Sequence, residues 1–145
     1  MIASVKKSSF ILLALVMLVG CKQKESLQTY FVDNQETASF TTVDIPTSIV
    51  NFEDANLSEE ELEAYQSVNK LNFLGFKLDS SNQAVYKSEM EKVSKILSHK
   101  KYIELSEFNL QGAKLQVKYI GENDVADEFI IFGASKDYGF GVLRV

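Results

Sequence analysis

The second half of the chain alternates apolar and polar residues with a period of two, which is typical of β-strands. The predicted strands cover residues 102–110, 113–120, 127–134 and 139–145. The segments between them are short and rich in turn-forming residues, and gaps of this kind favour hairpins. The pattern therefore predicts a four-stranded antiparallel meander.

The clearest alternation lies in residues 113–120. The apolar positions are Leu115, Val117 and Tyr119, and the polar positions are Lys114, Gln116 and Lys118. Such a strand has one buried and one solvated face. We therefore expect Val117 to face the interior between helices and sheet.

The first half of the chain carries helical patterns. Residues 26–36 place Leu27, Tyr30 and Phe31 on one face, with Ser26 as a plausible cap. Residues 57–68 have the spacing of a capping box at Ser58 and Glu61. Residues 83–99 form the longest pattern, and its apolar positions are Tyr86, Met90, Val93 and Leu97.

Two further strands are predicted between these helices. Residues 40–46 are rich in β-formers and end at Pro46, which marks a sheet edge or a strand end. Residues 70–78 are apolar on both faces, which favours a central strand. Residues 47–52 fit a short helix and an extended segment equally well. With helices early and a meander late, the expected class is α+β, an antiparallel sheet covered on one face by two or three helices.

The N-terminus has a different pattern. Lys6 and Lys7 precede an unbroken apolar run over residues 10–19. A membrane-spanning helix needs about 20 apolar residues, so this run is too short to span a bilayer. A basic start followed by a short apolar core is the layout of a secretory signal. A buried strand is the alternative, but it leaves the two lysines unexplained.

The end of that run resembles the lipobox of bacterial lipoproteins, in the sequence Leu18-Val19-Gly20-Cys21. The resemblance implies cleavage before Cys21, a diacylglycerol on its sulfur and an acyl chain on its new amine. The chain then divides into a signal peptide at residues 1–20, a lipidated tether at residues 21–26 and a single domain at residues 27–145. Five residues reach at most ~18 Å, so the tether keeps the domain close to the membrane.

Composition narrows the classes of partner. Residues 21–145 contain 13 basic and 20 acidic residues, a net charge of −7. A surface of this charge repels phosphate backbones, so nucleic acid is not an expected partner. Cys21 is the only cysteine, which excludes an internal disulfide. The expected partners are the membrane, through lipid on Cys21, and an envelope protein.

Residues that could carry chemistry are few. His99 is the only histidine, and it follows the last turn of a predicted helix beside two lysines. A lone histidine without a second ligand is more often a helix-end residue than a catalytic base or a metal ligand. Phosphate-binding loops, nucleophile elbows and dinucleotide fingerprints do not occur in the sequence. We therefore expect no cofactor and no catalytic residues.

Acidic residues gather at two places. Residues 59–61 open a predicted helix, where carboxylates interact favourably with the helix dipole. Residues 122–128 hold a second group around a predicted hairpin loop. Asp124, Asp127 and Glu128 are weak candidates for an oxygen-only calcium or magnesium site, although the EF-hand spacing is absent. A solvated turn is the simpler interpretation.

The order of these segments resembles a known family. The lipobox is followed by "SLQTYF", by "FTTVDIPTSIVNF", by a helix, a strand and a helix, and by the "DEFIIFGASKDYGFGVLRV" meander. This order is similar to that of the small bacterial envelope lipoproteins grouped as domain-of-unknown-function family four-two-five-two. The resemblance implies a periplasm-facing α+β domain, a gene near regulators of the extracytoplasmic-function sigma type, and a short further segment after Val145. The family assigns no catalytic residues.

The residues after the cysteine bear on location. Related lipoproteins at the cell surface can carry an acidic run here, whereas "KQKES" has two lysines and one glutamate. Lys22 also differs from the aspartate that marks inner-membrane retention in some bacteria. By this resemblance we expect the outer membrane, facing the periplasm.

Three functions remain open at this point. The leading hypothesis is a membrane-anchored, non-catalytic module for binding or signalling. The alternatives are an enzyme with an unrecognised carboxylate site and a carrier of a small ligand. An exposed apolar patch of several hundred Å² would favour a partner, and converging carboxylates in a pocket would favour the enzyme.

Overall fold

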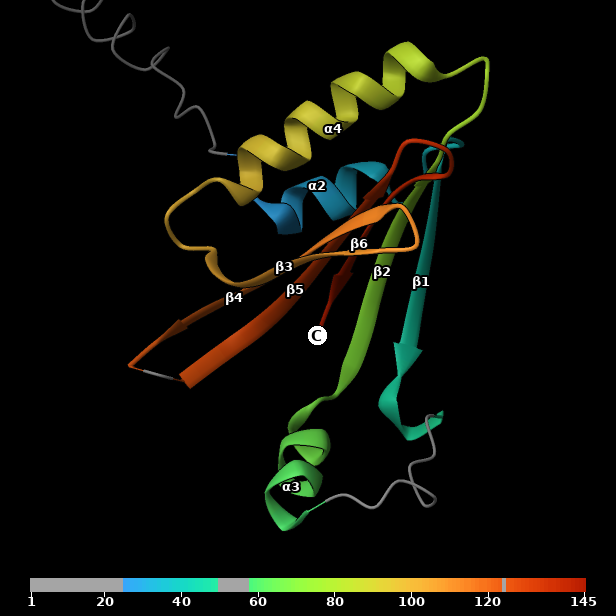
Figure 1. Cartoon of the computed structure of the whole chain (residues 1–145). Coiled ribbons are helices and arrows are strands. Elements are labelled where there is room, and N and C mark those ends of the chain that lie inside the picture. The colour runs from blue at the N-terminus through green and yellow to red at the C-terminus, as the bar shows by residue number, and fades with distance from the viewer. Residues whose placement is uncertain (1–24, 50–57, 124) are drawn as a thin grey trace, which may run out of the picture.

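The computed structural model describes residues 25–49, 58–123 and 125–145 (Figure 1). The helices are α2 (Leu27–Asn34), α3 (Glu59–Ser67) and α4 (Gln83–Leu97), with a 3-10 turn at Thr47–Ile49. The strands are β1 (Phe40–Pro46), β2 (Lys70–Lys77), β3 (Ile103–Leu110), β4 (Ala113–Glu122), β5 (Val125–Ser135) and β6 (Gly139–Arg144). The 3-10 turn resolves the ambiguity at residues 47–49, and residues 50–52 lie outside the described part.

The strands form one six-stranded antiparallel sheet in the order β1-β2-β6-β5-β4-β3. The four late strands make the expected meander, and the early β1–β2 pair joins it through β6. Helices α2 and α4 lie side by side over one face of the sheet, and α3 lies beyond the end of β2 (Figure 1). The expected α+β class is therefore confirmed, with two helices covering the sheet.

The covering helices form where their patterns predict. Ser26 caps α2, because its Oγ accepts a hydrogen bond from the backbone N–H of Thr29 at 3.1 Å. The core between these helices and the sheet consists of Leu27, Tyr30, Phe31, Leu74, Phe76, Val93, Ile96, Leu97, Tyr102, Ile130, Phe132, Phe140 and Val142. Tyr86 and Met90 pack against its margin. The predicted apolar faces of α2 and α4 therefore both meet the sheet.

Helix α3 begins directly after Ser58, whose carbonyl accepts from the backbone N–H of Leu62 at 2.9 Å. Leu62 itself is 45% exposed, because α3 extends away from the sheet. Leu57, the first residue of the predicted helical segment, lies outside the described residues. The predicted helix is confirmed, but it adds no layer to the core.

Two strand predictions are confirmed in detail. β1 is an edge strand and Pro46 is its last residue, so the missing proline N–H leaves the sheet intact. Gln111 and Gly112 connect β3 to β4 with positive φ angles of 49° and 83°. A two-residue loop with both angles positive matches the twist of an antiparallel hairpin.

One prediction is wrong, namely which face of β4 is buried. Lys118 is 9% exposed, and its ammonium lies 3.0 Å from Glu104 of β3. Lys114, Gln116 and Lys118 border a cavity together with Met90 and Leu97 of α4, so the polar face of β4 lies under the helix. The alternation of polar and apolar residues assigns side chains to two faces, but it does not show which face packs against the helices. The aliphatic part of a lysine can lie under a helix while its ammonium reaches a carboxylate.

Candidate functional site

The sheet face turned away from α2 and α4 is the candidate site. Side chains alternate between faces along a strand, and Leu74 and Phe76 point toward the helices. Their neighbours Leu71, Phe73 and Gly75 therefore point to the other side. Cross-strand registers align these positions into rows that run across the whole sheet.

Two rows span all six strands. One row is Thr41, Gly75, Gly141, Gly133, Leu115 and Phe108, and the next is Val43, Phe73, Leu143, Ile131, Val117 and Ser106. A third, partial row contains Ile45, Leu71, Phe129 and Tyr119. We call these sixteen residues the open face. It contains no charged side chain, and most of its members are large and apolar.

Solvent reaches much of the open face. Phe108 is 45% exposed, Phe129 is 41% exposed and Val43 is 41% exposed. Leu115, Val117 and Ile131 are half-buried. The structure therefore leaves a continuous apolar surface on a sheet whose other face already holds the core.

Three aligned glycines shape this surface. A Cβ at Gly75 or Gly141 would lie 2.8 Å or 2.7 Å from the ring of Phe73, and one at Gly133 would lie 2.8 Å from Leu115 Cδ2. Glycine is therefore required for Phe73 and Leu115 to lie down across the sheet. A groove of about 530 Å³ remains above this row. Its polar end is formed by Lys77, Ser135 and Tyr138, whose ring is 79% exposed.

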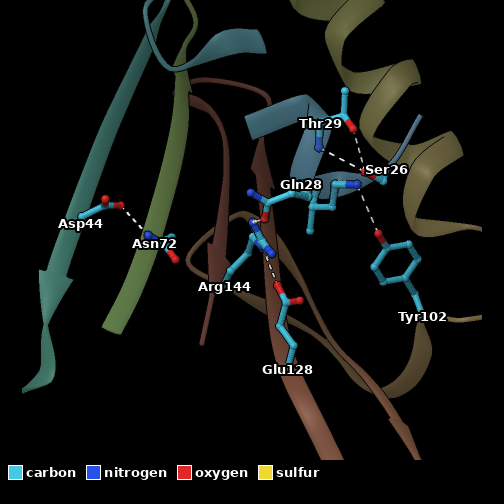
Figure 2. A network of polar contacts seen from close by, with 9 residues as sticks. Ser26, Gln28, Thr29, Asp44, Asn72, Tyr102, Glu128 and Arg144 are labelled. Atoms are coloured by element: carbon cyan, nitrogen blue, oxygen red, sulfur yellow. Dashed lines mark hydrogen bonds and ion pairs between the residues drawn. The ribbon is translucent and has the colours of Figure 1, made fainter. Parts of the chain in front are cut away.

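Polar side chains on the helix-covered side connect the layers. Figure 2 shows Arg144 of β6 between Glu128 of β5 and Gln28 of α2. Arg144 Nε pairs with Glu128, and its Nη1 donates to Gln28 Oε1 at 2.6 Å. The guanidinium also lies 5.1 Å from the ring centre of Phe31. Among the same contacts, the backbone N–H of Leu27 donates to the hydroxyl of Tyr102 at 3.3 Å.

A cavity of about 610 Å³ lies at the end of the sheet beside α3, and Arg144, Glu128 and Asn72 border it. Glu128 is held by Arg144, and Asn72 Nδ2 donates to Asp44 Oδ1 at 2.5 Å (Figure 2). These three side chains are therefore already engaged in cross-strand bonds. Their arrangement stabilises the sheet and its contact with α2.

Of the acidic residues predicted as weak metal ligands, the structure describes Asp127 and Glu128. They are neighbours on β5 at an irregularity in its register with β4, where Ile120 pairs with Glu128 and Gly121 pairs with Ala126. Glu128 is paired with Arg144, and Asp127 is exposed. Asp124 lies outside the described residues. Within the described ranges, no three His, Cys, Asp or Glu side chains lie close enough to hold a metal ion.

The structure describes His99 but not Cys21, the two other residues singled out from the sequence. His99 is exposed just beyond α4, and its Nδ1 accepts from the backbone N–H of Lys101 at 3.3 Å. Its carbonyl also accepts from the N–H of Tyr102, so the residue belongs to the turn after the helix. Cys21, the predicted lipidation site, lies outside the described residues. In the described part, no helix has the length and apolar character needed to cross a bilayer.

The open face was missed at the sequence level, although a signal was present. Strands β2, β5 and β6 each carry large apolar residues at adjacent positions, for example Phe73 and Leu74, or Ile130 and Ile131. Adjacent apolar residues in a strand mean that both faces are apolar. Because these three strands are neighbours in the sheet, the signal accumulates on one surface.

Comparison with known proteins identifies a family but no activity. No curated protein and no solved structure matches the chain. Residues 30–145 match the model of the family described as Domain of unknown function (DUF4252). That range includes all the strands and every residue of the open face. The chain therefore belongs to the DUF4252 family.

Proposed function

We propose that this protein is a non-catalytic binding module, held at a membrane by lipid on Cys21, that binds a protein partner through the open face. The observation that carries the proposal is the open face itself. Single-domain proteins rarely leave a contiguous apolar surface of several hundred Å² in water, and such surfaces are often interaction sites.

The size of the open face supports this function. Six strands ~4.8 Å apart, with side-chain rows spread over about 20 Å, give a projected area of ~500 Å². Large apolar patches on monomers measure ~300–600 Å² and are often functional. Val43, Phe108 and Phe129 would gain most from a partner, because each is at least 41% exposed.

The enzyme alternative has weaker support. Its carboxylate site was expected around residues 122–128, where Glu128 is already paired with Arg144 and Asp127 is exposed. The groove over the glycine row is lined by apolar side chains, with Lys77 as its one charged lining residue. A binding role uses these features directly, whereas carboxylate catalysis uses none of them.

The membrane itself is a less suitable occupant of the open face. Helix α2 begins at Leu27 on the opposite side of the sheet, and Leu27 is buried there. Helix and sheet layers pack about 10 Å apart, so the path from α2 around to the open face exceeds 10 Å. A tether of five residues reaches ~18 Å at full extension. Laying the open face on the bilayer would use more than half of that reach.

Photo-crosslinking in cells tests the binding surface. The full-length chain would carry a photoreactive phenylalanine analogue at Val117 or Phe108 of the open face, and at Val85 of α4 as control. Val85 is 47% exposed on the helix, so it matches Phe108 in accessibility. We expect a discrete protein adduct from the open-face positions and none from Val85. Equal labelling at all three positions would contradict the proposal.

Anchoring is tested separately through Cys21. We expect Cys21→Ser to abolish incorporation of labelled fatty acid and to remove the protein from the outer-membrane fraction. Separation of inner and outer membranes would show where the unmutated protein resides. Fatty acid incorporated equally into Cys21→Ser would refute lipidation at this residue.

A carrier of an elongated apolar ligand is the second candidate, and the groove favours it. Its volume of about 530 Å³ lies within the ~300–1,000 Å³ range of small-molecule sites. Mass spectrometry of the purified full-length protein under native conditions separates the two candidates. A bound small molecule that disappears in Leu115→Lys would favour the carrier, and a protein adduct at Val117 would favour the module.

A further inference from the structure

We propose that the occupant of the open face is a second copy of this chain, related to the first by a two-fold axis that lies between the two sheets. The inference rests on the proposed function, because it names the partner of the same surface. The resulting dimer has four layers, with the two sheets packed face to face and the helices outside.

Charge favours a second copy at this face over any other. Residues 21–145 carry a net charge of −7, so two copies repel each other across most of their surfaces. The open face has no charged side chain, and Glu104 and Glu107 of β3 are paired with Lys118 and Lys114 on the helix side. Contact through the open face therefore brings two acidic chains together without opposing their carboxylates.

Area is sufficient for a specific contact. The projected ~500 Å² on each copy gives a total of ~1,000 Å², which meets the lower limit for a specific interface. Two apolar sheet faces pack ~10 Å apart with strands roughly aligned, as in β-sandwiches. The half-buried Val117 and Ile131 would then become core residues of the sandwich.

The shape of the open face is complementary to that of a second copy of itself. The row containing Gly75, Gly141 and Gly133 forms a recess whose floor is the ring of Phe73 and Leu115, and the adjacent row presents Leu143, Ile131 and Val117. A two-fold axis that runs across the strands between these rows places the raised row of each copy opposite the recess of the other. Two-fold contacts require this property, because the same patch must serve as both partners.

The tether agrees with this arrangement. In the dimer both α2 helices lie on the outside, so neither N-terminus is enclosed by the interface. A two-fold axis normal to a membrane places both copies of residue 26 at the same height. Both ~18 Å tethers can therefore reach one bilayer surface.

The test uses the full-length lipidated chain, co-expressed in cells with two different epitope tags. With the photoreactive analogue at Val117, we expect an adduct of twice the chain mass that carries both tags, and none with the analogue at Val85. Phe108→Lys should weaken co-purification of the two tagged copies by roughly tenfold or more, because it buries an unpaired charge. Val85→Lys is the matched control and should leave co-purification unchanged.

Each outcome of this test either supports or overturns the dimer. Phe108 is already 45% exposed, so Phe108→Lys should keep its melting temperature in protein dilute enough to be monomeric, which separates loss of association from loss of folding. An adduct to a different protein would overturn the second copy while leaving the proposed function standing. An adduct to lipid alone, or no adduct from any open-face position, would overturn both.

Discussion

The hydroxyl of Tyr30 on α2 donates a hydrogen bond to Oε2 of Glu89 on α4 across 2.8 Å, and both side chains are buried. Lys92 completes the cluster with its ammonium 2.6 Å from Glu89 Oε1. A buried carboxylate needs partners for its oxygens, and here each oxygen has one. The bond therefore fixes the short helix α2 against the long helix α4.

Tyr30→Phe removes this hydrogen bond and leaves a buried carboxylate oxygen without its partner. We expect a loss of ~1.5–3 kcal/mol in the free energy of unfolding, the usual range for a hydrogen bond to a charged group. Denaturant unfolding followed by circular dichroism measures the change. Tyr138→Phe is the control, because Tyr138 is 79% exposed and should show almost no effect.

The same cluster predicts sensitivity to alkali. Burial, the hydrogen bond to Glu89 and the charge of Glu89, in that order, raise the pKa of Tyr30 above its ordinary value of 10.0. The folded protein therefore favours the neutral phenol. This contribution to stability is fully present below pH 10 and is lost as pH rises above it.

Unfolding measured over a series of pH values above 10 checks that direction. The stability of the unmutated protein should fall more steeply with pH than that of Tyr30→Phe. Burial also raises the pKa of Tyr86, so some alkaline sensitivity should persist in the variant. Parallel pH curves for the two proteins would contradict the assignment to Tyr30.

Two valines distinguish the two faces of the sheet. Val93 is fully buried on the sheet-facing side of α4, so Val93→Ala should cost ~2 kcal/mol, through two lost methyl groups and a cavity. Val117 is half-buried on the open face, so Val117→Ala should cost less in the monomer. Substitution of the exposed Glu59 or Glu60 should cost least. Thermal melts of dilute protein rank the variants, and equal losses at Val93 and Val117 would place both in the core.

Arg144 links β6, β5 and α2, so its substitution should destabilise all three elements. Arg144→Met keeps the stem over Phe31 but removes the bonds to Glu128 and Gln28. We expect a loss of ~1.5–3 kcal/mol, because the pair is largely shielded from water. Hydrogen exchange should report faster opening of α2. Arg144→Lys should recover only part of the loss, since an ammonium cannot bridge both partners as the guanidinium does.

His99 and the acidic residues of β5 should prove dispensable for ligand binding. His99→Ala should keep normal stability and normal complementation of a deletion strain, because the exposed ring bonds only to the neighbouring backbone. Calorimetric titration with calcium, magnesium and zinc should show no tight binding, since Glu128 is already paired with Arg144. Tight binding of any of these ions, or a His99→Ala phenotype equal to the deletion, would restore the enzyme hypothesis.

The sequence predicts local structure well here and long-range structure less well. Helix α4 and the β3–β4 turn follow from patterns within a few residues, namely the spacing of Val93 and Leu97 and the two-residue gap Gln111-Gly112 between two alternating segments. The pairing of β2 with β6 joins residues about 70 positions apart, and no local pattern specifies it. The position of the open face depends on that pairing, so it became visible only in the assembled sheet.

The orientation of β4 illustrates the same limit at one residue. Lys118 alternates with apolar neighbours and was expected in water, yet it lies under α4 with its charge on Glu104. The position of α4 on the sheet decides which of the two faces of β4 is buried. Glu89 was missed for a related reason, because its partner Tyr30 lies on another helix.

The central position of β6 has a consequence for biosynthesis. Residues 139–144 lie between β2 and β5, so the two early strands have no partner in the meander until these residues have emerged from the ribosome. Pairings between distant segments form slowly, because a long loop must close first. A nascent chain of this topology stays without its complete sheet until residues 139–144 have been synthesised. Under the proposed export of this chain to the membrane, late closure of the sheet would keep it competent for translocation.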